Sequence, residues 1–225
     1  ANFAVALGDP VGPEAEMEQT IHESMEFCRE NDWGVAFHQT LPDFLPIYKR
    51  LSLRKLKIGD DAIVNLATFS LAGNMKKELR QTVQRLEKSG IHTIQYEPPI
   101  SDPLIMQLRE VSDEWLQIPG RRERRFTLGL FEADYIRSTP VFIAADSDDK
   151  ILAFVNVIPS YGKNEATVDL LRRRMQAPNG VMDYLLIKLF FQSAEQGFIR
   201  FNLGMAPMAG FRSEERRVGK ECRSR

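Results

Sequence analysis

Hydrophobic and polar positions along the chain follow two periods, and the period changes at turns that contain glycine or proline. Segments 3–7 and 33–40 alternate with a period of two, which predicts strands. Between them the period is helical, which predicts a helix over 14–31, and a proline and an acid begin a second, short helix at 41–52. The apolar face of the first helix consists of Met17, Ile21, Met25 and Cys28.

The pattern after residue 53 continues this alternation. The segment 54–70, "RKLKIGDDAIVNLATFS", is predicted to form two strands joined at 59–61. A basic helix follows at 74–90 and ends at Gly90. The remaining predicted elements are a strand at 91–99, a helix at 101–118, a short helix near 132–138, strands at 140–146, 150–161 and 165–173, an apolar helix at 180–196, and a strand at 198–205.

The order of these elements predicts an α+β (mixed α/β) fold, in which helices cover the faces of a mixed sheet. The alternation before residue 73 is similar to part of the alternation after it, so two related α/β units in tandem are predicted. The helix at 180–196 is apolar nearly all round. This favours burial between two layers over a face open to lipid.

The composition is that of ordinary globular protein. Of the 225 residues, 43% are hydrophobic and 27% are charged. No uncharged apolar run reaches the roughly 18 residues that a membrane span requires. The N-terminus, "ANFAVALGDP", has no basic leader and no initiator Met, and it is not a signal peptide. We interpret it as a strand entered in mid-fold, and we expect the chain to be a fragment.

The segment 212–225, "RSEERRVGKECRSR", has no apolar periodicity. Back-translated, it resembles a common sequencing-library adapter read through in frame, so we interpret it as non-biological. The alternative is a basic tail that binds nucleic acid. Without this segment, Lys and Arg fall from 30 to 24 and Asp and Glu from 31 to 28, so the net charge changes from −1 to −4.

Cys222 lies in that segment, which leaves Cys28 as the single natural cysteine. One cysteine forms no disulfide framework, which favours a reducing compartment. The three histidines, His22, His38 and His92, are far apart and lack the spacing of metal ligands. No metal and no cofactor are predicted.

The strand–turn–helix around Asn179 and Gly180 is a candidate binding site. The first turn of a helix has unpaired backbone N–H groups and a positive dipole end, which bind anions or a developing oxyanion. Asn179 is predicted to be the N-cap, and Gly180 would let another group approach closely. An ordinary connection with nothing bound is the alternative.

Asp169 and Arg172 stand three residues apart at the end of the strand that precedes this turn. Their side chains could meet over one pocket, with the carboxylate accepting from an amine or hydroxyl and the guanidinium binding a phosphate or carboxylate. From these residues alone, a partly exposed structural salt bridge is the favoured explanation of the pair.

Basic residues gather in four clusters on a chain whose net charge is slightly negative: 49–57, 76–88, 121–125 and 172–174. Such patches suit a phosphate backbone or anionic lipid headgroups, although a solvated surface explains each cluster singly. The residues predicted to contribute to binding of a polyanion are Lys77, Arg80, Arg121 and Arg125.

Seven stretches together resemble the cytosolic catalytic domain of bacterial phosphatidylglycerol lysyltransferases, also called lysylphosphatidylglycerol synthases or multiple peptide resistance factors. The resemblance covers residues 3–211. The stretches are "ALGDPVG", "ELRQTVQRLEKSG", "EVSDEWL", "ERRFTLGLFEADY", "ILAFVNVIP", "VDLLRRR…APNGVMDYL" and "FNLGMAPMAGF".

The resemblance implies tandem GNAT-like acyltransferase domains at 1–72 and 73–211, the first lacking its start and the second lacking its C-terminal half. It implies transfer of an aminoacyl group, lysyl or alternatively alanyl, from aminoacyl-tRNA to phosphatidylglycerol, which confers resistance to cationic antimicrobial peptides. It also implies a place on the cytoplasmic face of the bacterial cell membrane, after an N-terminal transmembrane flippase region. It implies no oligomeric state.

Carried over by motif, the family's pocket Asp and Arg in "DLxR" fall on Asp169 and Arg172. They are implied to contact the aminoacyl amine and polar groups of the donor or the lipid. The family's further pocket residues, a lysine and an acidic pair, would lie beyond Phe211, so the chain itself is expected to be inactive. Two other hypotheses stay open at this point. One is a GNAT-like aminoacyl-tRNA transferase that modifies a peptidoglycan precursor or a protein, and the other is a non-catalytic tRNA- or lipid-binding module.

Overall fold

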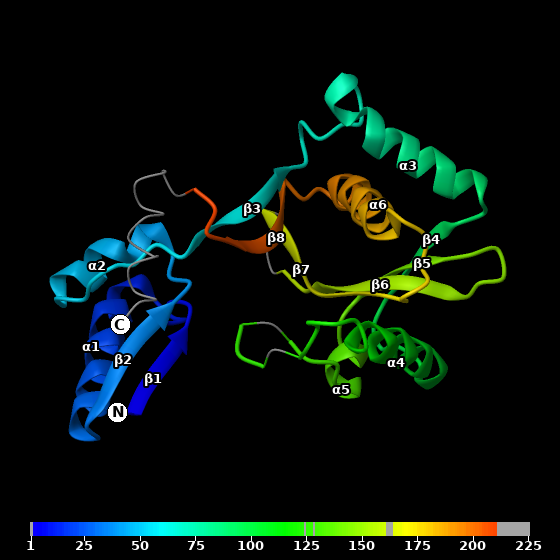
Figure 1. The fold of residues 1–225 in the computed structure, drawn as a ribbon. Coiled ribbons are helices and arrows are strands. Elements are labelled where there is room, and N and C mark those ends of the chain that lie inside the picture. The colour runs from blue at the N-terminus through cyan, green and yellow to red at the C-terminus, as the bar shows by residue number, and fades with distance from the viewer. Residues whose placement is uncertain (1, 124, 128, 161–163, 211–225) are drawn as a thin grey trace. The chain divides into compact units, whose positions relative to one another are not determined.

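The computed structural model describes residues 2–123, 125–127, 129–160 and 164–210 (Figure 1). The segment 212–225, interpreted above as adapter read-through, lies outside the described residues. The chain divides into two compact units, residues 1–58 and 59–225. This division falls earlier than the predicted boundary after residue 72, because the strand at 59–65 pairs within the second unit.

The first unit is a strand–helix–strand arrangement. Its strands β1 (Asn2–Leu7) and β2 (Trp33–His38) pair in parallel, which requires a crossover, and α1 (Glu14–Glu30) is that crossover. The predicted apolar face of α1 is confirmed for Met17, Ile21 and Cys28, which are buried, whereas Met25 is half-buried. A 3-10 turn (Pro42–Phe44) and α2 (Leu45–Arg50) complete this unit.

Asp9 fixes the loop that follows β1. Its carboxylate accepts hydrogen bonds from the backbone N–H of Leu41 and from the hydroxyl of Tyr48, both at 2.8 Å. Burial raises the pKa of Tyr48, and the hydrogen bond to Asp9 raises it further.

The second unit contains a six-stranded sheet in the order β3-β8-β7-β6-β5-β4. The strands β4 to β7 pair antiparallel in sequence, β7 and β8 pair in parallel, and β8 pairs antiparallel with β3. The strands are β3 (Gly59–Asn65), β4 (His92–Tyr96), β5 (Val141–Ala145), β6 (Ile151–Ile158), β7 (Glu165–Arg173) and β8 (Arg200–Pro207).

The prediction of two strands within 54–70 was wrong. Only β3 forms there, and residues 53–58 have no regular structure. The alternation of Leu and Lys before Gly59 has no apolar surface to cover, and Leu56 is 84% exposed. Alternation predicts a strand only where a neighbouring strand and a core accept it.

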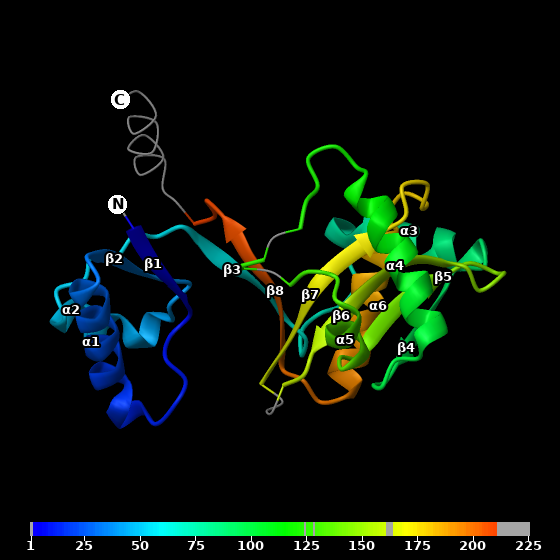
Figure 2. The same cartoon turned by 90° about the horizontal axis from the view of Figure 1, so that it is seen from below.

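Helices cover both faces of this sheet. On one face lie α3 (Lys77–Lys88), preceded by a 3-10 turn (Asn74–Lys76), and α6 (Val181–Glu195); on the other lie α4 (Asp102–Leu116) and α5 (Ala133–Arg137) (Figure 1). In Figure 2, which is turned by 90°, α4 and α5 lie in front of the sheet. A separate hydrophobic cluster fills each side.

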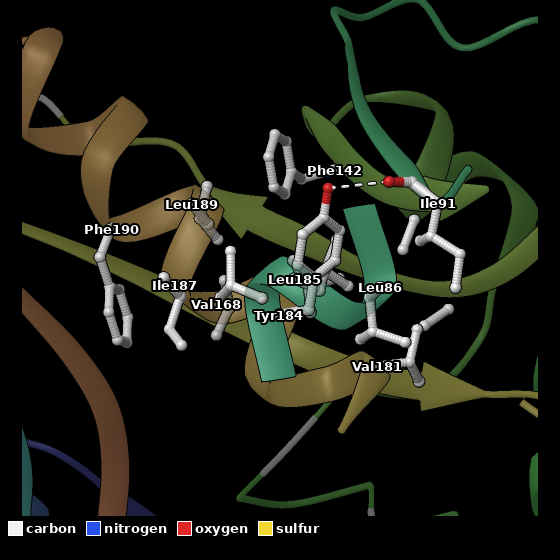
Figure 3. Close-up of a cluster of buried hydrophobic side chains, with 14 of the residues drawn as sticks. Leu86, Ile91, Phe142, Val168, Val181, Tyr184, Leu185, Ile187, Leu189 and Phe190 are labelled. Carbon is white, nitrogen blue, oxygen red and sulfur yellow. Dashed lines mark hydrogen bonds between the residues drawn. The ribbon is translucent and has the colours of Figure 1, made fainter. Parts of the chain in front are cut away.

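The predicted burial of the apolar helix is confirmed. Helix α6 lies between the sheet and α3, and its buried side chains face both, as Figure 3 shows for Tyr184, Leu185 and Phe190. The Tyr184 hydroxyl donates to the carbonyl of Ile91 at 3.1 Å, so the one polar atom on this ring is satisfied. Within the described residues, no helix combines the length and the apolarity that crossing a bilayer would demand.

Candidate functional site

A β-bulge in β7 turns Asp169 and Arg172 toward the same face of the sheet. The register with β6 pairs Val155 with Leu171 and Val157 with Val168, so Asp169 and Leu170 together oppose the single residue Asn156. In a regular strand, residues three apart point to opposite faces. The predicted meeting of Asp169 and Arg172 therefore depends on this extra residue.

Residues of β7 before and after the bulge belong to different hydrophobic clusters, which confirms the change of face. Val168 belongs to the cluster beneath α3 and α6, whereas Leu170 belongs to the cluster beneath α4 and α5. Beyond the bulge, Arg172 pairs with Phe154, which lies in the same α4 and α5 cluster. Bulges are frequent next to active sites, because they redirect a side chain without ending the strand.

The Asp169 carboxylate accepts three hydrogen bonds from two donors in the segment between α4 and β5. The backbone N–H of Gly129 donates to both carboxylate oxygens, at 2.8 and 3.0 Å, and the hydroxyl of Tyr135 donates at 2.7 Å. Gly129 has to be glycine here, because a Cβ at this position would lie 2.0 Å from Asp169 Oδ2. The carboxylate is thus oriented before any ligand arrives.

The Tyr135 hydroxyl, which donates to Asp169, has a raised pKa. Burial raises the pKa of the Tyr135 hydroxyl, the hydrogen bond to Asp169 raises it further, and a hydrogen bond with Asn156 acts in the opposite direction. Tyr135 therefore stays protonated at neutral pH and acts as a hydrogen-bond donor to the carboxylate.

Arg172 is 3% exposed, so it is buried and not partly exposed as the salt-bridge alternative expected. Its Nη2 donates to Glu123 at 2.8 Å, and the guanidinium lies 3.8 Å from the centre of the Trp115 ring. Burial lowers the pKa of Arg172, against the opposing effect of the Glu123 charge. The Trp115 ring replaces water on one side of the charge.

Two nitrogens of this guanidinium are left without a partner. Among the described residues, Arg172 Nε and Nη1 are buried and make no hydrogen bond. An unsatisfied buried donor costs about 1–3 kcal/mol, and more where the group is charged. Such a cost is common where a charge serves a ligand rather than the fold.

Arg174, which is two residues along the strand, has the opposite character. Its Nε donates to the carbonyl of Ile151 at 2.7 Å, its Nη2 pairs with Glu110 at 3.2 Å, and its Nη1 pairs with Glu114. All three nitrogens are engaged, and α4 is thereby fixed to the end of β7. Arg174 is a structural residue.

Asn179 and Gly180 do not join this site. Their contacts are with α3, since the carbonyl of Asn179 accepts from Arg85 at 2.7 Å and a Cβ on Gly180 would lie 2.4 Å from Thr82 Cγ2. The N-cap of α6 is Gly180, with a left-handed φ of 83°, and not Asn179 as predicted. The close approach that glycine permits here is made by Thr82, a residue of this chain.

Replacing Gly180 by Ala should lower the free energy of unfolding by about 3 kcal/mol, since it combines backbone strain with a clash against Thr82. Gly197→Ala is the matched control: its φ is 90°, but a Cβ there meets nothing within 4 Å. We expect about 1 kcal/mol for the control in chemical denaturation. Equal losses of unfolding free energy for the two variants would show that the Thr82 side chain moves aside for the added Cβ.

The basic residues predicted to bind a polyanion lie in different places. Lys77 and Arg80 are on α3, whereas Arg121 and Arg125 precede α5 on the other face of the sheet. Arg80 donates to the carbonyls of residues 71 and 73 and so braces that loop. Arg121 lies 5.2 Å from the centre of the Trp115 ring. Lys77 and Arg125 are exposed.

The pairing of β7 with β8 ends just before Asp169. The parallel register runs from Glu165 with Arg200 to Thr167 with Asn202, after which β8 pairs with β3 alone. The candidate site therefore begins where two parallel strands separate. Within the described residues, no group of three or more His, Cys, Asp or Glu side chains is arranged to hold a metal ion.

Sequence reasoning missed five residues of this site. They surround Asp169 and Arg172 from α4, the segment before α5, α5 itself and β6, and each lies inside one of the stretches that carry the family resemblance. These residues are Trp115, Glu123, Gly129, Tyr135 and Asn156.

Comparison with known proteins identifies the family. The sequence profile of the C-terminal region of phosphatidylglycerol lysyltransferase matches residues 1–223. The chain belongs to this family. It is 36% identical over 209 residues to the phosphatidylglycerol lysyltransferase of Bacillus subtilis and 30% identical over 209 residues to that of Staphylococcus epidermidis. These alignments cover 93% of this chain but only 24% and 25% of the relatives, so the chain spans about a quarter of their length.

Solved structures of phosphatidylglycerol lysyltransferase relatives share its fold. The structure of L-PGS from Bacillus licheniformis has a TM-score of 0.85 at 36% identity and covers 92% of this chain and 65% of that one. The C-terminal domain of a protein from Agrobacterium fabrum that is named a lysylphosphatidylglycerol synthetase has a TM-score of 0.86 at 36% identity, with coverage of 96% and 66%.

A more distant structure, FemX, has a TM-score of 0.58 at 8% identity and covers 99% of this chain and 77% of that one. This likeness concerns the fold alone. The mixed α/β character is confirmed by the structure, whereas two tandem, incomplete GNAT-like domains stay a prediction.

Proposed function

We propose that this chain is part of an enzyme that transfers an aminoacyl group, lysyl rather than alanyl, from aminoacyl-tRNA to phosphatidylglycerol. The supporting observation is 36% identity over 93% of the chain to a relative named phosphatidylglycerol lysyltransferase. The oriented carboxylate of Asp169 and the buried charge of Arg172 are consistent with this function. The complete protein would act on lipid at the cytoplasmic face of the bacterial membrane, beyond an N-terminal transmembrane flippase region.

The reaction exchanges one ester for another. A glycerol hydroxyl of the lipid attacks the aminoacyl carbonyl, the new ester bond forms as the bond to the tRNA ribose breaks, and the proton of the glycerol hydroxyl ends on the ribose oxygen. Such a transfer depends on positioning and on donors for the oxyanion. The product lipid has an added amine, so its negative charge is neutralised or reversed. This weakens attraction of cationic antimicrobial peptides.

Asp169 is proposed to bind the ammonium group of the aminoacyl moiety. Its carboxylate is already oriented by Gly129 and Tyr135, and each of its oxygens retains acceptor capacity. Arg172 is proposed to stabilise negative charge on the reacting group or on a phosphate through the nitrogens that have no partner among the described residues.

A chimera tests the function directly. The 209 matching residues of the Bacillus subtilis relative would be replaced by those of this chain, and the lipids of a host without such an enzyme would be extracted. We expect lysylated phosphatidylglycerol. Alanylated lipid would correct the amino acid. A chimera that is present at the level of the parent protein and modifies no lipid would contradict the proposal, and a modified peptidoglycan precursor or protein would replace it.

The exposed basic residues are proposed to contact the tRNA phosphates. Replacing Lys77 and Arg125 together by Gln in the chimera should weaken tRNA binding and lower the slope of log affinity against log salt by about 0.7–0.9 for each phosphate that is no longer bound. Arg29→Gln with Lys150→Gln is the charge-matched control, because both residues are exposed and lie outside the four basic clusters. An unchanged slope in the first pair would remove these residues from the interface.

A further inference from the structure

Asn156 is a buried amide in the middle of an apolar strand. It lies in β6, "ILAFVNVI", and its exposed fraction is 0%. Burying an amide is costly unless its polar atoms are hydrogen-bonded. An apolar residue at this position would extend the pattern of the strand, so the reason for Asn156 has to be found in its contacts.

The contacts of Asn156 are with the β-bulge and with the neighbours of Asp169. Its Oδ1 accepts the backbone N–H of Leu170 at 2.8 Å, which is the N–H that the bulge removes from the regular ladder. Its Nδ2 lies 3.5 Å from Thr139 Oγ1, at the limit of a hydrogen bond, and its hydrogen bond with Tyr135 opposes the rise in the pKa of that hydroxyl.

The Asn156 side chain thus contacts the bulge. It also contacts Tyr135, whose hydroxyl donates to the Asp169 carboxylate. Without an acceptor for the Leu170 N–H, the bulge would leave a buried donor unpaired. A strand that recovered regular pairing would place Asp169 and Arg172 on opposite faces.

We propose that Asn156 is a positioning residue for aminoacyl transfer: it stabilises the bulge of β7 and so brings Asp169 and Arg172 to one face of the sheet. Asn156 itself need not touch either substrate. The role in transfer rests on the proposed function, whereas the role in positioning does not, and the experiment separates the two.

The positioning is measured in the 225-residue chain by amide hydrogen exchange, resolved by NMR. The Leu170 amide reports the bulge, and the Gly129 amide, which donates to Asp169, reports the carboxylate. In Asn156→Leu, which keeps the branching at Cγ but has no acceptor, both amides should exchange about tenfold faster, as expected for the loss of one hydrogen bond of ordinary strength. Asn156→Asp retains the acceptor oxygen, so the Leu170 amide should stay protected.

Val155→Ala is the matched control. Val155 is the preceding residue of β6, is equally buried, and belongs to the cluster on the other face. Its truncation should lower the melting temperature through the removal of methyl groups, while Leu170 and Gly129 keep their protection relative to the other amides of the sheet. This control separates loss of the bulge from general loss of stability.

The transfer itself is measured in the chimera. Asn156→Leu should lower kcat at least tenfold and leave KM for aminoacyl-tRNA within about twofold, because the tRNA backbone supplies most of the binding. Val155→Ala should leave both constants unchanged in the folded protein.

Native-like protection of both amides in Asn156→Leu would overturn the proposal, whatever the activity. So would a tenfold or greater loss of Leu170 protection in Asn156→Asp, a test that remains if the Leu variant does not fold. Loss of protection together with an unchanged kcat would refute the role in transfer. A parent chimera without transferase activity would refute the proposed function and leave the exchange result standing.

Discussion

Arg172→Met should reduce aminoacyl transfer roughly a hundredfold and leave the free energy of unfolding within about 1 kcal/mol of the parent protein. The loss of transfer follows from the proposed role of Arg172 in stabilising negative charge on the reacting group, and single donors of this kind contribute about a hundredfold or more. Stability should hold, because Met keeps an apolar contact with Trp115 and eliminates two buried nitrogens that have no partner among the described residues. Glu123 is partly exposed and can be solvated.

Arg174→Met is the control for this variant, since it is the same substitution two residues away on the same strand. Arg174 is fully engaged by Ile151, Glu110 and Glu114. Its loss should cost about 2–3 kcal/mol, less than a fully buried pair because both glutamates are partly exposed. Transfer per folded molecule should be preserved.

Denaturant titration and transfer measured on the same samples decide between two roles for Arg172. A structural ion pair requires that Arg172→Met destabilise the protein by several kcal/mol and that the folded fraction remain active. That outcome would remove Arg172 from the site. Arg172→Lys adds a second test, because it keeps the charge, loses the planar fork of donors, and is also expected to impair transfer.

The sequence predicted most helices and strands of the second unit, because their patterns are long and periodic. The helix at 180–196 was predicted from its apolar run, and α6 occupies Val181–Glu195. Its N-cap was displaced by one residue, from Asn179 to Gly180. Asn is the better cap by residue type, but the backbone there is left-handed and packed against Thr82, which only the neighbouring helix determines.

The division between the units could not be predicted from local pattern. β3 stands near the first unit in sequence, yet its partner is β8, and Val64 pairs with Phe201 far along the chain. The preceding segment 53–58 has a similar alternation and no strand beside it. Strand pairing over such separations depends on the whole sheet, not on the residues of the segment.

The sequence predicted two residues of the candidate site, but not the contacts that bring them to one face of the sheet. Asp169 and Arg172 were found through the "DLxR" motif, but residues three apart in a strand should diverge. The bulge that unites them depends on Asn156 in the neighbouring strand, and the Arg172 guanidinium is covered by Trp115 of α4. These contacts join segments that are distant in sequence, so periodicity does not reveal them.

Asp169→Asn should lower the efficiency of transfer about tenfold to a hundredfold, the equivalent of roughly 1.5–3 kcal/mol for the loss of a charged hydrogen bond. Asn preserves the shape but not the charge that would hold an ammonium group. An amide oxygen at the Oδ2 position can still accept from Gly129 and Tyr135, but the NH2 group in place of Oδ1 cannot accept from Gly129, so one of the present hydrogen bonds is also lost.

The same substitution has a pH signature at Tyr135. Because the folded-state pKa of Tyr135 is raised, the native protein retains a proton that the unfolded chain releases above pH of about 10, and stability falls as the pH rises through that range. Asp169→Asn removes part of this rise, so the loss of stability at alkaline pH should become smaller. Denaturant titration at several pH values, with Tyr135→Phe as reference, measures the effect.

Asp9→Asn provides the matched control, because Asp9 also accepts from a backbone N–H and from a tyrosine hydroxyl, those of Leu41 and Tyr48. Both substitutions remove a carboxylate from a tyrosine whose pKa is raised, and both should reduce the alkaline loss of stability. Only Asp169→Asn should impair transfer. If Asp169→Asn transferred aminoacyl groups at the parental rate, Asp169 would be a structural counterpart of Asp9. Arg172 would then be the remaining charged candidate on this face of the sheet.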